Sequence, residues 1–211
     1  MLNVICVLRS GGIYTQEWVR KLKDGCERNL PKHIFTCLSD VPVPCNRIPL
    51  KHDWPSWWAK VEMFRKGVIE DETLYLDLDT VLVGKVEILR NGVDLAMLQS
   101  FWKHDAVGSG VMYFSGENVP THIYDKFAKQ PKAYIEHHNR NADGVYVGDQ
   151  AFISDCLGQE NIPRINDYLP GIKSYKLHCH RRLPKDASIV CFHGQPRPTD
   201  VHTDWMKQHW A

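Results

Sequence analysis

Short apolar runs alternate along this chain with stretches in which apolar residues recur every three or four positions. Runs of about four to eight apolar residues between turn residues are typical of buried strands, and the wider spacing is typical of helices with one apolar face. The pattern predicts strands over residues 3–8, 33–38, 47–50, 73–76, 95–99, 110–114 and 188–192, and helices over residues 14–30, 57–66, 119–129 and 149–157. It also predicts a mobile polar loop over residues 132–148 and a packed closing helix within the tail at 200–210.

Strands that alternate with helices favour an α/β fold with a mostly parallel central sheet flanked by helices. The chain has 211 residues, which is long enough to bury a core and suits a single domain over residues 1–211. In such sheets, ligands bind at the carboxyl ends of the strands. Polar residues stand at three of these ends: Ser10 after the first strand, Asp40 after the second, and Asp77 with Asp79 after the fourth.

The overall composition is that of a soluble globular protein, with 43% hydrophobic and 24% charged residues. A formal net charge of +1 gives no global attraction to nucleic acid or to an anionic membrane. No apolar run approaches the roughly 20 residues that span a bilayer. The first apolar run has no basic region ahead of it, so it indicates a first strand and not a signal peptide.

Seven cysteines, an odd number at irregular spacing, lie partly inside apolar runs. This usage predicts reduced core thiols in a cytoplasmic protein. One cluster suggests a zinc site as an alternative, and it consists of His178, Cys179, His180, Cys191 and His193. No CxxC pair accompanies this cluster, which argues against zinc.

The two carboxylates Asp77 and Asp79 point to metal chemistry. In a strand they would lie on the same side, with Leu78 on the other, and they would repel each other unless a cation lay between them. Oxygen ligands of this kind suit Mn²⁺ or Mg²⁺, and Mg²⁺ usually leaves positions open for substrate phosphates. The alternative is a pair of solvated aspartates at a strand end.

Five short segments then occur in an order found in one enzyme family. They are WAK at residues 58–60, YLDLDTVLVG at 75–84, GSGVMY at 108–113, GDQ at 148–150 and FHGQPRP at 192–198. Together they resemble the motifs of nucleotide-sugar glycosyltransferases of the GT-A fold, especially the glycogenin-like family 8. Two positions depart from the family pattern, because Arg197 stands where those enzymes carry lysine and Gly108 where they carry asparagine.

The resemblance implies that Asp77, Asp79 and His193 bind Mn²⁺ or Mg²⁺. It implies that Lys60 and Arg197 neutralise the phosphates of a nucleotide diphosphate-sugar donor. Among such donors, it favours a UDP-sugar. The other donor residues that it implies are Leu8, Ser10 and Tyr14 around the nucleotide base and ribose, Ser109 and Gly194 in their motifs, and Asp149 and Gln150 beside the sugar. Candidates for a catalytic role are Asp149, Gln150 and Asp105. Transfer with retention of the anomeric configuration is expected.

Each of these assignments has a structural alternative. His193 could make a structural hydrogen bond, and Lys60 and Arg197 could be solvated surface charges. Asp149 could be an N-cap of the following helix, and Tyr14 could be a core residue.

Two other functions fit parts of the sequence. A haloacid-dehalogenase-type phosphatase also carries Asp-x-Asp after a strand, with Asp77 as nucleophile and Asp79 as acid/base, although that motif normally lies on the first strand. A non-catalytic carbohydrate-binding module could use Trp54, Trp57 and Trp58 as a stacking platform, whereas burial would make them core residues.

The acceptor class stays open between a glycan, another hydroxyl compound and modified DNA. A basic segment at residues 178–185 bears on this question, and its charged members are His178, His180, Arg181, Arg182 and Lys185. Such a run is commonly a solvated loop. As an acceptor surface it would suit an anionic glycan or DNA, and binding would weaken with salt.

Overall fold

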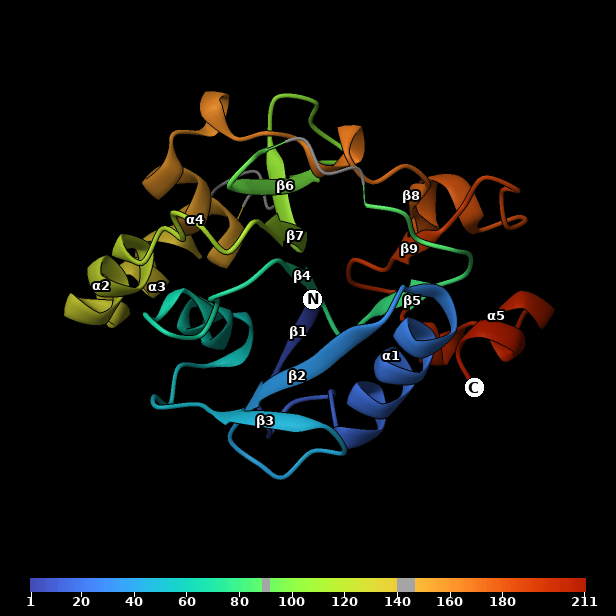
Figure 1. The fold of residues 1–211 in the computed structure, drawn as a ribbon, viewed down its shortest axis with the longest axis horizontal. Helices are drawn as coiled ribbons and strands as arrows, with labels where there is room; N and C mark the ends of the chain where they lie inside the picture. The colour runs from blue at the N-terminus through green and yellow to red at the C-terminus, as the bar shows by residue number, and fades with distance from the viewer. Residues whose placement is uncertain (89–91, 140–146) are drawn as a thin grey trace.

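The computed structural model describes residues 1–88, 92–139 and 147–211 (Figure 1). The strands are β1 (Leu2–Leu8), β2 (His33–Ser39), β3 (Asn46–Pro49), β4 (Thr73–Leu76), β5 (Thr80–Leu82), β6 (Leu95–Gln99), β7 (Val107–Phe114), β8 (Ile172–Ser174) and β9 (Ile189–Cys191). The α-helices are α1 (Gln16–Asn29), α2 (His122–Lys129), α3 (Pro131–His138), α4 (Asp149–Leu157) and α5 (Asp204–His209). Tighter or wider helical turns are η1 (Ser56–Phe64), η2 (Gln159–Asn161), η3 (Ile165–Asp167), η4 (Tyr175–Cys179) and η5 (Pro198–Asp200).

The central sheet has six strands in the described residues, in the order β3-β2-β1-β4-β7-β6. β3, β2, β1 and β4 pair in parallel, while β7 is antiparallel to both β4 and β6. Every strand of this sheet except β7 therefore runs in the same direction. The predicted α/β fold with a mostly parallel central sheet is confirmed.

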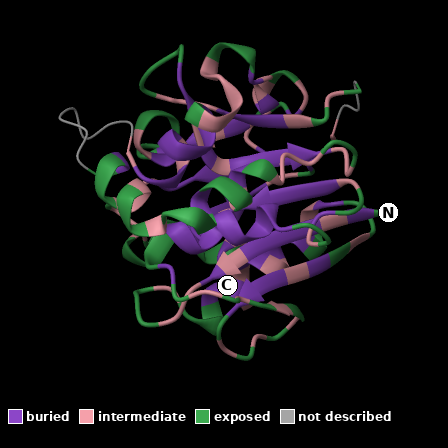
Figure 2. Cartoon of the chain, turned by 90° about the vertical axis from the view of Figure 1, so that its left-hand side faces the viewer, coloured by how far each residue is buried: buried purple, intermediate pink, exposed green. Residues whose placement is uncertain are grey.

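The sheet is covered on both faces because its inner strands are apolar on both sides. In β1, Val4, Cys6 and Leu8 pack into one core cluster with α1, and Ile5 packs into a second cluster with η1 and α2. Figure 2 shows the strands buried along most of their length, while exposed positions gather on the outward sides of helices and in loops. Near-continuous apolar strands of this kind are expected where helices cover both faces.

A smaller three-stranded sheet, β5-β9-β8, extends the fold beside the carboxyl ends of the central strands. β9 pairs antiparallel with β5 and parallel with β8. β5 and β8 were not predicted, because strands of three residues are too short to show a period. This sheet places the residues after β9 next to those that follow β4.

The prediction of a loop over residues 132–148 is wrong in its first half. Residues Pro131–His138 form α3, with proline in the first helical turn, where its missing N–H costs no hydrogen bond. The polar and aromatic residues of this short helix do not show the three-to-four spacing of apolar residues from which a helix is predicted. Residues 140–146 of the predicted loop lie outside the described residues.

Several predicted boundaries also shift. The helix predicted over residues 57–66 is the 3₁₀-helix η1, which ends at Phe64 before an extended Arg65. β7 begins at Val107 and not at Gly110, because the glycines at 108 and 110 concealed its start. The closing helix of the tail forms as α5, over a shorter range than predicted.

Candidate active site

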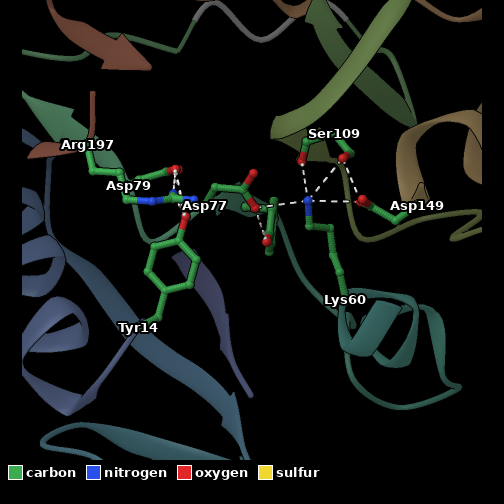
Figure 3. A network of polar contacts seen from close by, with 8 residues as sticks. Tyr14, Lys60, Asp77, Asp79, Ser109, Asp149 and Arg197 are labelled. Atoms are coloured by element: carbon green, nitrogen blue, oxygen red, sulfur yellow. Dashed lines mark hydrogen bonds and ion pairs between the residues drawn. The ribbon is translucent and has the colours of Figure 1, made fainter. Parts of the chain in front are cut away.

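Asp77 and Asp79 lie in a tight turn directly after β4. The Asp77 N–H donates to the Gly110 carbonyl at 2.9 Å, and the Thr80 N–H donates back to the Asp77 carbonyl at 3.0 Å. Because the chain turns here, the two carboxylates do not share one set of partners. Figure 3 shows Asp77 between two groups, with Tyr14, Asp79 and Arg197 on one side and Lys60, Ser109 and Asp149 on the other.

Asp77 is held by a buried lysine and a buried tyrosine. Lys60 Nζ lies 2.9 Å from Asp77 Oδ1, and the Tyr75 hydroxyl donates to the same oxygen at 2.6 Å. A side chain at Gly110 would approach Asp77, because a Cβ there would lie 3.3 Å from Oδ2. The glycine in β7 therefore leaves space for the carboxylate.

Lys60 connects Asp77 to Asp149 at the start of α4. Its ammonium lies 2.9 Å from Asp149 Oδ2 and donates to Ser109 Oγ at 3.0 Å, and Ser109 Oγ donates to Asp149 Oδ2 at 2.6 Å. Burial by itself lowers the pKa of Lys60, but the charges of Asp149 and Asp77 outweigh it and hold the pKa above its usual value. Lys60 is therefore a buried, permanently charged group, and the surface alternative for it is wrong.

Asp79 is held from the two ends of the chain. The Tyr14 hydroxyl donates to Asp79 Oδ2 at 2.8 Å, and Arg197 Nη1 donates to the Tyr14 hydroxyl at 2.6 Å and to Asp79 Oδ2 at 3.4 Å. Asp79 is buried, and burial together with the negative charge of Asp77 raises its pKa well above the usual value. Tyr14 thus orients a carboxylate through its hydroxyl, and its ring packs edge-on against Trp18.

His193 does not join the two aspartates. The backbone is close, since the Phe192 N–H donates to the Asp79 carbonyl at 3.3 Å, but the His193 ring contacts Ser174 Oγ at 2.7 Å and Phe101 at a centroid distance of 5.3 Å. Burial and the charge of Lys176 lower the pKa of His193. In this structure the His193 ring makes the kind of hydrogen bond that the structural alternative expects.

No group of three histidine, cysteine or acidic side chains within the described ranges is arranged to hold a metal ion. The predicted ligand set of Asp77, Asp79 and His193 is thus not assembled, and the zinc alternative around Cys179 and Cys191 is not formed either. All seven cysteines lie in described segments and are free thiols.

The strand ends at β1 and β2 form a second polar cluster. The Ser10 N–H and hydroxyl both donate to Asp40, at 2.8 and 2.5 Å. Arg9 joins Asp40 to Asp53. The sequence placed Arg9 beside Ser10 at the end of the first strand but indicated no role for it, and nothing in the sequence pointed to Asp53. Leu8, predicted to contact the donor, is a buried core residue.

The other predicted residues are spread over the rim. Gln150 lies beside Gly108, where a Cβ would be 3.7 Å from the Gln150 Oε1 atom. Asp105 lies between β6 and β7, where its backbone carbonyl accepts from Gln159 and Arg164. Among the described residues, no hydrogen bond or ion pair joins Asp105 to Asp77 or Asp79, and a catalytic role for it stays a prediction.

The three neighbouring tryptophans separate in the fold. Trp54 and Trp58 are buried in the core around α2, whereas Trp57 is 49% exposed. Trp57 lies against Gly148, which has a left-handed φ of 75° and directly precedes Asp149. A three-ring stacking platform is therefore not formed.

No protein-family model matches this chain, and no curated protein sequence matches it. Solved structures do match. The glycosyltransferase GlyE of Streptococcus pneumoniae TIGR4 superposes with a TM-score of 0.61 at 15% identity, over 95% of this chain and 56% of GlyE. The galactosyltransferase LgtC, in complex with donor and acceptor sugar analogues, superposes with a TM-score of 0.58 at 13% identity, over 96% of this chain and 90% of LgtC.

A third match is the bifunctional glycosyltransferase WbbM, with a TM-score of 0.53 at 10% identity over 98% of this chain and 50% of WbbM. The chain spans a little over half of the length of GlyE and most of the length of LgtC. At such identities the likeness shows the fold, which is the α/β fold of GT-A glycosyltransferases.

Proposed function

We propose that this chain is a GT-A glycosyltransferase domain that moves a hexosyl or pentosyl group from a nucleotide diphosphate-sugar to an acceptor hydroxyl. The observation that carries the proposal is the meeting of Asp77, Asp79, Lys60 and Arg197 at the carboxyl ends of the strands of this fold. In open α/β sheets that edge is the usual ligand site. A UDP-sugar, transfer with retention and membership of the glycogenin-like family 8 are the finer parts of the proposal.

Mn²⁺ or Mg²⁺ is the proposed cofactor. Three carboxylates, of Asp77, Asp79 and Asp149, face only two cations in this network, Lys60 and Arg197. Carboxylate oxygens that outnumber the neighbouring cations are suitable ligands for these ions. Asp77 and Asp79 would hold the ion, and when bound it would stabilise negative charge on the leaving diphosphate. His193 is left out of this ligand set, because its ring is bonded to Ser174.

The protein's own groups prepare the reaction. The bond from the sugar carbon to the diphosphate breaks, the diphosphate keeps the electron pair, and the acceptor oxygen bonds to the sugar carbon while its proton passes to an oxygen of the departing diphosphate. Lys60 fixes Asp77 and Asp149 in place before the donor arrives, so their orientation costs nothing during the reaction. Asp149 and Gln150 at the start of α4 are the proposed residues beside the sugar. We propose the strand-end cluster around Ser10 and Asp40 for the nucleoside.

The acceptor remains a glycan, another hydroxyl compound or DNA. The basic segment at 178–185 is mostly exposed, in agreement with a solvated surface. No helix in the part of the chain that the structure describes is both long and apolar enough to cross a bilayer. The phosphatase alternative has no supporting observation, since the matched folds are glycosyltransferases and Asp77 is already engaged by Lys60 and Tyr75.

The test is a screen of nucleotide sugars with Mn²⁺, read first as thermal stabilisation and then as donor hydrolysis. The variant Asp79→Asn keeps the shape of the side chain but removes its charge. We expect it to lose at least about a hundredfold of metal-dependent hydrolysis, because stabilisation of the leaving group is worth several kcal/mol. Asp204→Asn, at a fully exposed carboxylate, is the matched control. Wild-type turnover in Asp79→Asn would contradict the proposal.

A further inference from the structure

The two cations of the site are both occupied. Lys60 is bonded to Asp77, Asp149 and Ser109, and Arg197 is bonded to Asp79 and Tyr14. Neither can turn to a phosphate without leaving a buried carboxylate unpaired, which is strongly unfavourable. A diphosphate that enters this site therefore needs a cation that has no partner yet.

Lys176 is such a cation. It lies at the start of η4, directly after β8, and it makes no hydrogen bond or ion pair with any residue in the described ranges. Lys173, three residues earlier in β8, is by contrast bonded to Asp186 at 2.6 Å. Ser174, the last residue of β8, pairs with Cys191 in the parallel β8–β9 register, and its hydroxyl lies 2.7 Å from His193 Nε2, so η4 begins beside the segment that follows β9.

The ammonium of Lys176 lies over Gly194. A Cβ placed on Gly194 would be 3.7 Å from Lys176 Nζ, and the left-handed φ of 74° at this residue strains any other amino acid. Gly194 is exposed and carries no side chain, so the Lys176 ammonium lies next to backbone that a ligand can reach. A glycine at such a position allows a ligand to come close to the backbone.

Gly194 also lies inside the site. Both ends of the segment 192–197 contact Asp79. At one end the Phe192 N–H donates to the Asp79 carbonyl, and at the other end Arg197 Nη1 lies 3.4 Å from Asp79 Oδ2. Gly194 lies between these two ends, and Lys176 covers it from η4.

We propose that Lys176, over Gly194, binds the diphosphate of the donor, while Lys60 and Arg197 hold the carboxylates in place. This inference rests on the proposed function and deepens it, since it names the cation that receives the leaving group. Lysine suits this role as a compact point charge with three donors. Strong hydrogen bonds between ammonium and phosphate oxygens would form without breaking any contact of the resting site.

The test uses inorganic pyrophosphate and UDP, each with Mn²⁺, and measures dissociation constants by calorimetry. We expect Lys176→Gln to weaken both by about tenfold, as the loss of one charge-assisted contact predicts. Lys176→Arg should restore binding to within about threefold, because it returns the positive charge. Lys173→Gln, the neighbouring lysine, should bind both ligands like the wild type.

The outcomes separate the two proposals. Equal binding of pyrophosphate by Lys176→Gln and by the wild type would overturn the role of Lys176 and leave the proposed function standing. A weakened Lys176→Gln that Lys176→Arg does not restore would also overturn it, since the effect would then be structural. A wild-type protein that binds neither pyrophosphate nor UDP would overturn the proposed function itself, and this inference with it.

Discussion

The Tyr14 hydroxyl, near the start of the chain, joins the Asp79 carboxylate to the guanidinium of Arg197, near the end of the chain. It donates to Asp79 and accepts from Arg197, 183 residues away in sequence. The guanidinium also lies 5.3 Å from the centroid of the Tyr14 ring, a cation–π contact. One part-buried hydroxyl therefore helps to hold Asp79, on which the proposed metal chemistry depends.

We predict that Tyr14→Phe lowers the free energy of unfolding by about 1–2 kcal/mol, because two partners in a part-buried site lose a hydrogen bond. The ring contact with Trp18 is kept, so the change isolates the hydroxyl. Urea denaturation followed by circular dichroism measures it.

Tyr168→Phe is the control, because the Tyr168 ring packs partly buried against the same core and its hydroxyl has no hydrogen-bond partner among the described residues. We expect a change within about 0.5 kcal/mol for this control. A Tyr14→Phe protein as stable as the control would show that the hydroxyl does not hold Asp79.

At the scale of elements, the start of α4 depends on one glycine. Gly148 takes a left-handed φ of 75° and places Asp149 in the first helical turn, where Lys60 and Ser109 contact it. The indole of Trp57 fills the space that a side chain at 148 would need, since a Cβ there would be 2.5 Å from Nε1. η1 and α4 are thereby held together at the site.

Gly148→Ala should lower the free energy of unfolding by about 1–2 kcal/mol for the backbone strain alone. Displacement of Trp57 adds to this cost. The double variant Gly148→Ala with Trp57→Ala removes the clash with the indole but not the backbone strain. We therefore expect it to recover only the stability that Gly148→Ala loses through displacement of Trp57. Thermal denaturation of both proteins provides the comparison.

Gly12→Ala is the matched control, because a Cβ at Gly12 meets no atom within 4 Å and its φ is not left-handed. Its stability should stay within about 0.5 kcal/mol of the wild type. A Gly148→Ala protein that behaved like this control would contradict the role given to Gly148.

At the scale of the molecule, the last helix of the chain, α5, packs against the first helix, α1. α5 lies beside α1 in Figure 1, and Trp210 contacts Trp18 edge-on at a centroid distance of 5.5 Å. Lys21 and Arg28 of α1 donate to the carbonyls of Trp210 and His209. These contacts hold α5 against α1. They thereby anchor the C-terminal part of the chain, in which Arg197 contacts Asp79.

We predict that Trp210→Ala lowers the free energy of unfolding by about 3–5 kcal/mol, the range for truncating a buried aromatic residue. Trp210 is 7% exposed, whereas Trp102 is 54% exposed and serves as the control. Trp102→Ala should cost less than about 1 kcal/mol. Similar losses in both variants, measured by urea denaturation, would show that the tail is not anchored through Trp210.

The sequence by itself determined the elements that depend on neighbours along the chain. The apolar run before Asp77 predicted β4, the three-to-four spacing around Trp18 and Leu22 predicted α1, and their alternation predicted the class of sheet. The position of two aspartates at a strand end predicted where the site lies. These features follow from local backbone geometry and burial, which a linear pattern records.

Only the tertiary structure decided which side chains meet at that edge. The pairing of Lys60 with Asp149, the reach of Arg197 to Tyr14 and the turn of the His193 ring toward Ser174 depend on segments far apart in sequence. The short strands β5 and β8 also form only because β9 lies between them. Contacts of this kind are fixed by packing and charge in three dimensions, so no period along the chain could record them.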